Sequence, residues 1–150
     1  RTMWLDCSEQ RKQFINEVFQ FKKNLYNGST TVLLTQPISE DGYCSEEEKI
    51  ELYRTIIKKN NLQNVVIKRH PREITDYTKI GSHVHVDDNQ YPFELLALNN
   101  LKIDKVVTIF STAAYSFKRM CNVEIIGTEE FDFLKRKVGI YKGEKYSIIK

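Results

Sequence analysis

The stretch NVVIKRHP, residues 64–71, indicates how the chain folds. Its apolar residues run without alternation into two cations and then into His70 and Pro71. An unbroken apolar run of this kind is typical of a strand that is covered on both faces, as in a parallel sheet. Pro71 ends such a strand and restricts His70 to extended backbone. The segment therefore predicts a buried parallel strand that ends at a histidine.

Similar signals recur along the chain. Two more nearly continuous apolar runs, TTVLLT and KVVTIF, and two shorter ones predict the remaining strands: 30–35, 83–88, 105–110 and 122–127. Between them, the segments 45–60 and 91–100 have helical spacing, and Ser45 with Glu48 forms a capping-box pattern. The inward stripe of the first of these helices is Ile50, Tyr53, Ile56 and Ile57. Strands that alternate with helices predict an α/β fold with a parallel sheet.

The leading segment, residues 1–28, predicts one amphipathic helix that ends at Asn27-Gly28. Its apolar stripe is Phe14, Val18, Phe21 and Leu25, with Ile15 and Phe19 beside it. The final segment, residues 135–150, is basic, with six Lys or Arg against one Glu. A solvated end is the favoured interpretation of this tail, and contact with a missing domain or peripheral contact with a membrane surface stay open.

Composition limits the class of protein. A chain of 150 residues with 41% hydrophobic and 29% charged residues fits a single folded domain. No apolar run is long enough to cross a membrane, and a net charge of +3 without an arginine-rich patch argues against nucleic acid as a partner. The cysteines, Cys7, Cys44 and Cys121, are widely spaced, which predicts reduced thiols and a cytoplasmic location. Since the chain starts at Arg1, we expect a fragment of a longer protein.

Polar groups follow three of the predicted strands. They are Glu40-Asp41-Gly42, His70-Pro71 and Ser111-Thr112. The carboxyl ends of parallel strands meet at one edge of a sheet, where ligands of open α/β folds bind. There a carboxylate can accept a proton from a hydroxyl, an imidazole can neutralise a departing phosphate, and hydroxyls can bind that phosphate. Each group alone also fits a structural role, as a turn, a strand end and a helix N-cap respectively.

The stretch HVHVDD, residues 83–88, offers a second candidate site. His83 and His85 would share one face of a strand, as a two-histidine metal site requires, with Asp87 and Asp88 close by. A short polar edge strand explains the same pattern and is the interpretation we favour. We therefore expect no metal site here.

The three polar groups, in this order, resemble the motifs of the bacterial lipooligosaccharide sialyltransferases and the related capsular polysialyltransferases. Those enzymes have an acidic pair followed by glycine, then His-Pro, then a Ser/Thr pair. The flanking stretches LLTQPISEDGYCSEEEKIELY, VVIKRHPRE and YPFELL are similar to the lipooligosaccharide family as well. The resemblance covers residues 31–115.

The resemblance implies a fold and a reaction. It implies a Rossmann-like sheet with flanking helices that forms the C-terminal, donor-binding half of a two-domain GT-B glycosyltransferase. The reaction would be the inverting transfer of sialic acid from CMP-sialic acid to a lipooligosaccharide or capsular glycan. It would need no metal or other cofactor. A separate N-terminal domain would complete the enzyme, so we expect the isolated chain to be inactive or incomplete.

The resemblance also implies roles for individual residues. Asp41 would be the general base, with Glu40 as the rival for that role. His70 would contact the phosphate and assist the departure of CMP. The implied nucleotide-binding residues are His70, Pro71, Glu94, Ser111 and Thr112. Lys68, Arg69 or Arg72 would balance the charge of the leaving group, although strand alternation predicts that Lys68 and Arg69 point to opposite faces.

Other interpretations stay open. A GT-B transferase that uses a different nucleotide-linked sugar would have the same fold and a similar site. A non-catalytic α/β binding module would also fit the fold, but its Asp41, His70 and Ser111 would then point apart. A homodimer, or attachment at the inner membrane, is compatible with the sequence.

Overall fold

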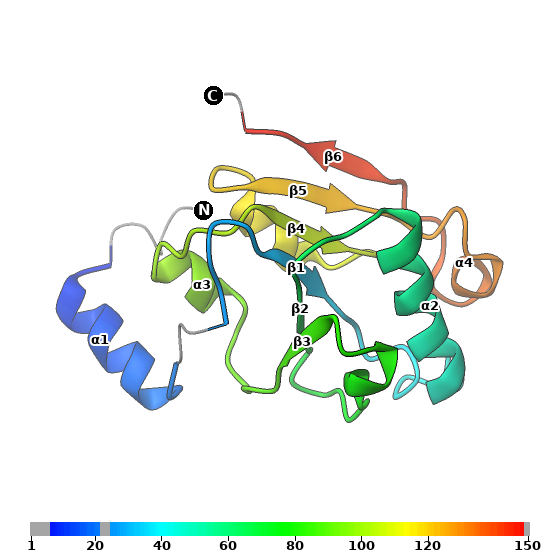
Figure 1. The fold of residues 1–150 in the computed structure, drawn as a ribbon, viewed down its shortest axis with the longest axis horizontal. Helices are drawn as coiled ribbons and strands as arrows, with labels where there is room; N and C mark the ends of the chain where they lie inside the picture. The colour runs from blue at the N-terminus through cyan, green and yellow to red at the C-terminus, as the bar shows by residue number, and fades with distance from the viewer. Residues whose placement is uncertain (1–6, 22–24, 149–150) are drawn as a thin grey trace.

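The centre of the computed structural model, which describes residues 7–21 and 25–148, is one six-stranded sheet with the order β3-β2-β1-β4-β5-β6 (Figure 1). The strands are β1 (Thr31–Leu34), β2 (Val65–Lys68), β3 (Val84–Asp87), β4 (Lys105–Thr108), β5 (Asn122–Ile125) and β6 (Glu144–Tyr146). β1 to β5 are parallel, and β6 is antiparallel to β5. Apart from the direction of β6, this is the strand order of a Rossmann-type sheet. The predicted α/β class with a mostly parallel sheet is confirmed.

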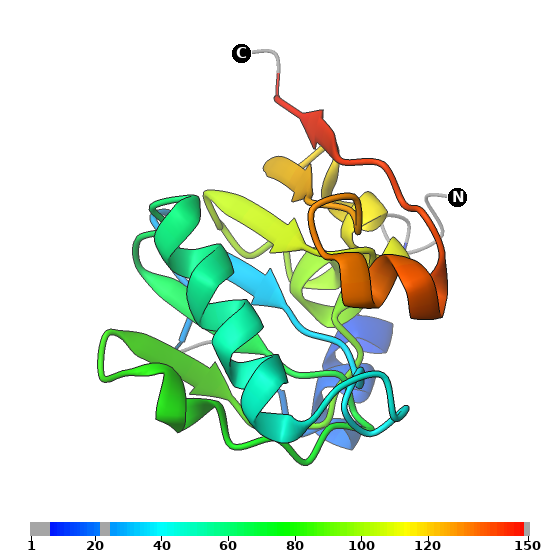
Figure 2. The ribbon, with the colours of Figure 1, turned by 90° about the vertical axis from the view of Figure 1, so that its right-hand side faces the viewer.

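Helices cover both faces of the sheet. They are α1 (Glu9–Val18), α2 (Glu46–Lys59), α3 (Glu94–Leu98) and α4 (Asp132–Val138), with the 3-10 helices η1 (Tyr77–Ile80) and η2 (Thr112–Phe117). α2 lies in front of the sheet in Figure 2, and α1 lies behind it. No helix of the part that the structure describes is long and apolar enough to span a membrane.

Each face of the sheet has its own apolar core. Along β1, Val32 and Leu34 belong to the core that includes α3 and η2, whereas Leu33 belongs to the core that includes α2 and η1. All four residues of β1 are buried, and so are all four of β2. An unbroken apolar run is therefore required, because both faces of these strands are covered. The prediction made from NVVIKRHP is confirmed.

α2 begins as predicted. The Ser45 side chain accepts a hydrogen bond from the Glu48 backbone N–H, and the Glu48 carboxylate accepts one from the Ser45 backbone N–H. This reciprocal pair satisfies two amides at the start of the helix. The predicted inward residues Ile50, Tyr53, Ile56 and Ile57 are all buried, and Lys49 is buried among them.

The prediction for the leading helix is wrong in its length and its buried face. α1 ends at Val18, and Gln20 has a φ of 50°, a left-handed conformation that an α-helix does not continue through. Phe14 and Val18, the two stripe residues within α1, are 66% and 59% exposed, and Ile15 beside them packs against the core instead. The predicted stripe over residues 14–25 assumes one continuous helix. Because α1 ends at Val18, Phe14 and Val18 do not share one helical face with Phe21 and Leu25. Residues 1–6 and 22–24 lie outside the described part.

The C-terminal segment contains structure that the sequence pattern did not predict. α4 extends to Val138, and β6 pairs with β5, with Tyr146 opposite Val123. This part of the basic tail is thus attached to the edge of the sheet, as far as residue 148, where the described part ends.

Candidate functional site

The site lies where the strand order reverses. From the centre of the sheet, the chain proceeds from β1 to β2 and β3 on one side, and from β4 to β5 on the other. The loops that follow β1 and β4 therefore diverge at the carboxyl edge and leave a crevice between them. The turn after β2 borders the same crevice. These are the positions of the three predicted polar groups.

One cavity at this edge, which we call the switch-point cavity, has a volume of about 440 Å³. It is lined by all five residues that were predicted to bind nucleotide: His70, Pro71, Glu94, Ser111 and Thr112. Its apolar walls come from Leu34 at the end of β1 and from the segment 91–93 before α3. The cavity combines apolar walls with a few polar groups, as small-molecule sites do.

A second cavity, which we call the Asp41 cavity, has a volume of about 530 Å³. Asp41 lines this cavity but not the switch-point cavity. The two cavities share His70, Ser111 and Thr112. The structure thus brings the acidic group, the histidine and the hydroxyl pair to one continuous region, with His70 at the boundary.

The loop after β4 is fixed by backbone and side-chain hydrogen bonds. The Ser111 backbone N–H donates to Thr108 Oγ1 at 3.2 Å, and the Thr108 hydroxyl donates to the Leu34 carbonyl at 3.2 Å. Ser111 occupies the N-cap position of η2, but its side chain makes no capping hydrogen bond. The N-cap explanation therefore accounts for the backbone position of Ser111 and not for its hydroxyl.

His70 is oriented by the turn that it begins. The Glu73 backbone N–H donates to the His70 carbonyl at 2.9 Å, with Pro71 at the second position of the turn, where its fixed φ fits. The Arg72 backbone N–H donates to His70 Nδ1 at 3.2 Å. Because Nδ1 is the acceptor, the proton of a neutral ring resides on Nε2. Nε2 is therefore the ring nitrogen that can donate to a ligand.

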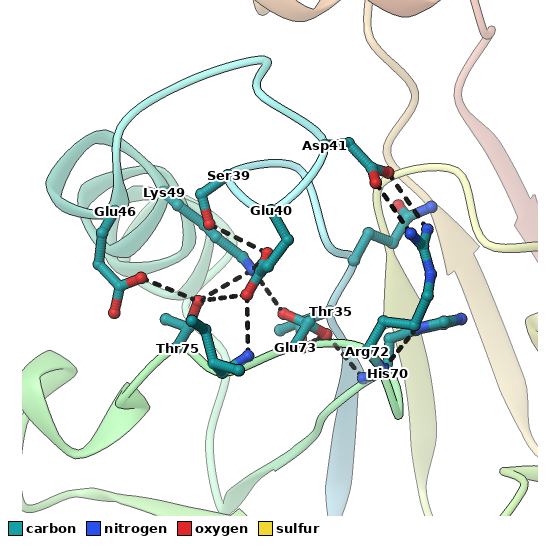
Figure 3. Close-up of polar contacts among 12 residues, drawn as sticks. Thr35, Ser39, Glu40, Asp41, Glu46, Lys49, His70, Arg72, Glu73 and Thr75 are labelled. Atoms are coloured by element: carbon teal, nitrogen blue, oxygen red, sulfur yellow. Dashed lines mark hydrogen bonds and ion pairs between the residues drawn. The ribbon is translucent and has the colours of Figure 1, made fainter.

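A buried carboxylate holds this turn in place (Figure 3). Glu73 Oε1 accepts from the His70 backbone N–H at 2.6 Å and from the Thr35 hydroxyl at 2.8 Å. Its other oxygen, Oε2, pairs with Lys49 Nζ at 2.8 Å and accepts from the Tyr77 hydroxyl. Neither Glu73 nor Lys49 has any exposed side-chain surface. Glu73 thus connects the ends of β1 and β2 to α2.

Glu40 belongs to the same buried network. Burial acts to raise the pKa of Glu40, but hydrogen bonds from Lys49 and from the Ile74 backbone N–H outweigh it and hold the pKa at about 2. The Lys49 bond is 2.7 Å long and the Ile74 bond 2.9 Å. Glu40 is therefore ionised and engaged by protein donors. Its side chain points towards Lys49 and Thr75 (Figure 3), and it does not line the Asp41 cavity.

Asp41 is placed differently from its neighbour. Its two carboxylate oxygens pair with the guanidinium of Arg72, at 3.0 and 3.3 Å. Gly42 follows with a φ of 75°, which a residue with a Cβ adopts only at a cost, so the glycine of this motif is required by the turn. An incoming hydroxyl would have to compete with Arg72 for the Asp41 carboxylate.

The remaining cations lie at the base of the switch-point cavity. Lys68 and Arg69 both line it, but their charged ends have separate partners. The Arg69 guanidinium donates to the Thr75 carbonyl at 3.3 Å and pairs with Asp88 at 3.0 Å. Burial lowers the pKa of Lys68, whose ammonium donates to the Asn89 carbonyl and lies 4.1 Å from the ring centre of Tyr91.

HVHVDD forms an edge strand, as favoured. β3 is the last strand on its side of the sheet, and His83 and His85 are exposed. Asp87 lies on the same face of β3 as His85, but it is buried there and accepts hydrogen bonds from the hydroxyls of Tyr26 and Tyr91. Within residues 7–21 and 25–148, no three His, Cys, Asp or Glu side chains converge as metal ligands.

Sequence reasoning missed the residues that support the site. Lys49 could have been found, because a lysine at the spacing of a buried apolar stripe must have a charged partner. Glu73, three residues after His70, gave no comparable signal. Tyr141, which lines the Asp41 cavity, was assigned to the tail.

An open, mostly parallel sheet with a polar cavity at its switch point places the chain in the class of doubly wound α/β proteins, whose ligands bind at the carboxyl edge. Within that class, the chain belongs to glycosyltransferase family 52, whose model matches residues 7–128. It is 39% identical over 142 residues to an uncharacterized protein from Haemophilus influenzae, an alignment that covers 93% of the chain. The chain spans about half the length of that relative, 46%. No solved structure matches it.

Proposed function

We propose that this chain is the donor-binding part of a bacterial sialyltransferase, which transfers sialic acid from CMP-sialic acid to a glycan. Membership of glycosyltransferase family 52, a family of bacterial sialyltransferases, supports the class of reaction. The observation that supports the site most strongly is the junction of two cavities at His70, Ser111 and Thr112. A transferase needs such a junction, because donor and acceptor must meet at the reacting carbon.

In the proposed reaction, Asp41 accepts the proton of the acceptor hydroxyl, whose oxygen attacks the anomeric carbon of the donor. The bond between that carbon and the phosphate oxygen breaks, and CMP leaves with the electron pair. Attack opposite the leaving group inverts the configuration. The contacts of Glu40 support Asp41 as the base, because Glu40 is held by Lys49 and does not line the Asp41 cavity.

CMP would occupy the switch-point cavity. There the hydroxyls of Ser111 and Thr112 would bind its phosphate, and His70 Nε2–H would donate to the oxygen that leaves. Glu94, which is half-buried at the start of α3, would bond the ribose or the base. Lys68 and Arg69 add positive charge beside the phosphate, so we expect transfer to continue in the presence of EDTA.

The test is a donor panel with the full-length protein. We expect CMP-sialic acid to be used and UDP- and GDP-linked sugars to be rejected. Asp41→Asn should reduce kcat at least 100-fold while CMP still binds, and Ser111→Ala with Thr112→Val should weaken CMP binding. Transfer from a different nucleotide sugar would favour another GT-B transferase, and failure of every nucleotide to bind would favour a non-catalytic module.

A further inference from the structure

The Asp41 cavity has an aromatic wall that the predicted site does not include. Tyr141, in the segment between α4 and β6, stacks on Phe110, which follows β4. The ring centres are 5.2 Å apart, and the planes differ by 20°. Both rings line the cavity, and Tyr141 is 46% exposed. An aromatic ring is thus presented to the cavity that contains Asp41.

The position of Tyr141 is set by its backbone. The Thr128 backbone N–H donates to the Tyr141 carbonyl at 2.9 Å, and the Tyr141 backbone N–H donates to Thr128 Oγ1 at 3.0 Å. Gly127 allows this approach, since a Cβ there would overlap the Tyr141 carbonyl oxygen. The backbone of Tyr141 is therefore held in place, and its ring packs on Phe110 at the cavity wall, even though the segment lies at the edge of the fold.

The two cavities place different demands on their occupants. In an inverting displacement the attacking hydroxyl and the leaving phosphate lie on opposite sides of the anomeric carbon. If the nucleotide occupies the switch-point cavity, the acceptor must therefore approach from the Asp41 cavity. Sugars present apolar C–H faces that pack on aromatic rings, while their hydroxyls seek polar groups. The Asp41 cavity offers both.

We propose that Tyr141 forms the acceptor subsite, on which a pyranose ring of the glycan stacks while its hydroxyl reaches Asp41. The inference rests on the proposed function, which supplies the donor in the neighbouring cavity. The inference adds two things to the proposed function. One is the class of ligand, a neutral pyranose of the acceptor, and the other is a contact residue from the C-terminal segment. Tyr141 acts here through binding and takes no part in proton transfer.

The experiment compares Tyr141→Ala, Tyr141→Phe and Tyr115→Ala in the full-length protein. Tyr115 is the matched control, because it is also a surface tyrosine, 39% exposed, but packs against Tyr146 and lines neither cavity. We expect Tyr141→Ala to raise the KM for the acceptor about tenfold, with KM for CMP-sialic acid and its hydrolysis without acceptor within about twofold. Tyr141→Phe and Tyr115→Ala should behave like the parent protein. Melting temperatures identify a variant that fails to fold.

Binding of lactose and of a lipooligosaccharide core oligosaccharide, followed by saturation-transfer NMR, separates the two proposals. Saturation of the sugar protons that is lost in Tyr141→Ala but kept in Tyr141→Phe supports the subsite, even if no donor is turned over and the proposed function fails. An unchanged acceptor KM in Tyr141→Ala overturns the subsite while the transferase stands. An equal rise in both KM values, or no sugar binding to the parent protein, also overturns it.

Discussion

The substitution Lys49→Met tests whether the buried network positions the site. Methionine fills much of the volume of the lysine side chain but leaves Glu73 and Glu40 without their shared cation, which lies 2.8 and 2.7 Å away respectively. Removing one partner of a buried ion pair costs about 3–5 kcal/mol. In a domain of this size that corresponds to a melting temperature lower by about 6–20 °C.

The assay is thermal or urea unfolding at several pH values. The pKa of Glu40 lies at about 2 in the folded protein, against 4.5 as its ordinary value. A lowered pKa stabilises the fold above pH 4.5, and this contribution is lost as the pH falls towards 2. The hydrogen bond from Lys49 contributes much of the lowering of the Glu40 pKa. The difference in free energy of unfolding between the parent protein and Lys49→Met should therefore become smaller as the pH falls from 4.5 towards 2.

Lys59→Met is the matched control. Lys59 lies on the same helix and pairs with Glu130, but its side chain is 60% exposed, and exposed pairs contribute less than about 1 kcal/mol. The reasoning would be refuted if Lys49→Met cost no more than Lys59→Met, or if its cost did not depend on pH. If Lys49→Met loses transfer activity at temperatures where its fold is intact, we would conclude that the network also positions His70.

Two further predictions concern other parts of the chain. Cys121 is buried and Cys44 half-buried, and burial raises the pKa of Cys44 to about 11 and that of Cys121 to about 12. Neither thiol should therefore react appreciably with iodoacetamide at pH 8 in the folded protein. Mass spectrometry of the two peptides checks this, and rapid labelling of both in the native protein would contradict the raised pKa values. Gly127→Ala should destabilise the fold more than Gly139→Ala, because both have positive φ values, 80° and 95°, but only at Gly127 would a Cβ meet the Tyr141 segment. Unfolding curves of the two variants decide the point, and equal losses would show that the contact is unimportant.

The central strands were predictable because their faces are both buried, which leaves an unbroken apolar signal such as Val65–Ile67. The alternation of strands and helices then indicates right-handed crossovers and a parallel sheet, but it does not by itself choose among the strand orders of doubly wound folds. This reasoning also brought Asp41, His70 and Ser111 to one edge, whereas Glu94 was implied only by the family resemblance. It could not separate Glu40 from Asp41, because the two are adjacent in sequence and differ only in the partners that the fold supplies.

Weaker local signals failed where tertiary contacts decide the outcome. β6 has three residues, two of them exposed, and forms because β5 offers an unpaired edge. Tyr141 reaches the site only through its pairing with Thr128, thirteen residues earlier. The leading segment has helical spacing throughout residues 14–25, but α1 ends at Val18, and the left-handed conformation of Gln20 just beyond it has no signature in the sequence. In each case the deciding partner is distant or the deciding dihedral angle is not encoded by residue type.

The central place of β1 has a consequence for synthesis on the ribosome. β1 emerges before both of its partners, and β2 emerges well before β4. A nascent chain that ends after β3 can therefore pair three strands and cover Leu33 with α2. The opposite face, with Val32 and Leu34, stays uncovered until α3 and η2 have been synthesised. Until then that apolar face and the open edge of β1 are available to chaperones or to other nascent chains. We expect the interval between the emergence of β3 and that of β4 to be the stage of synthesis most prone to aggregation.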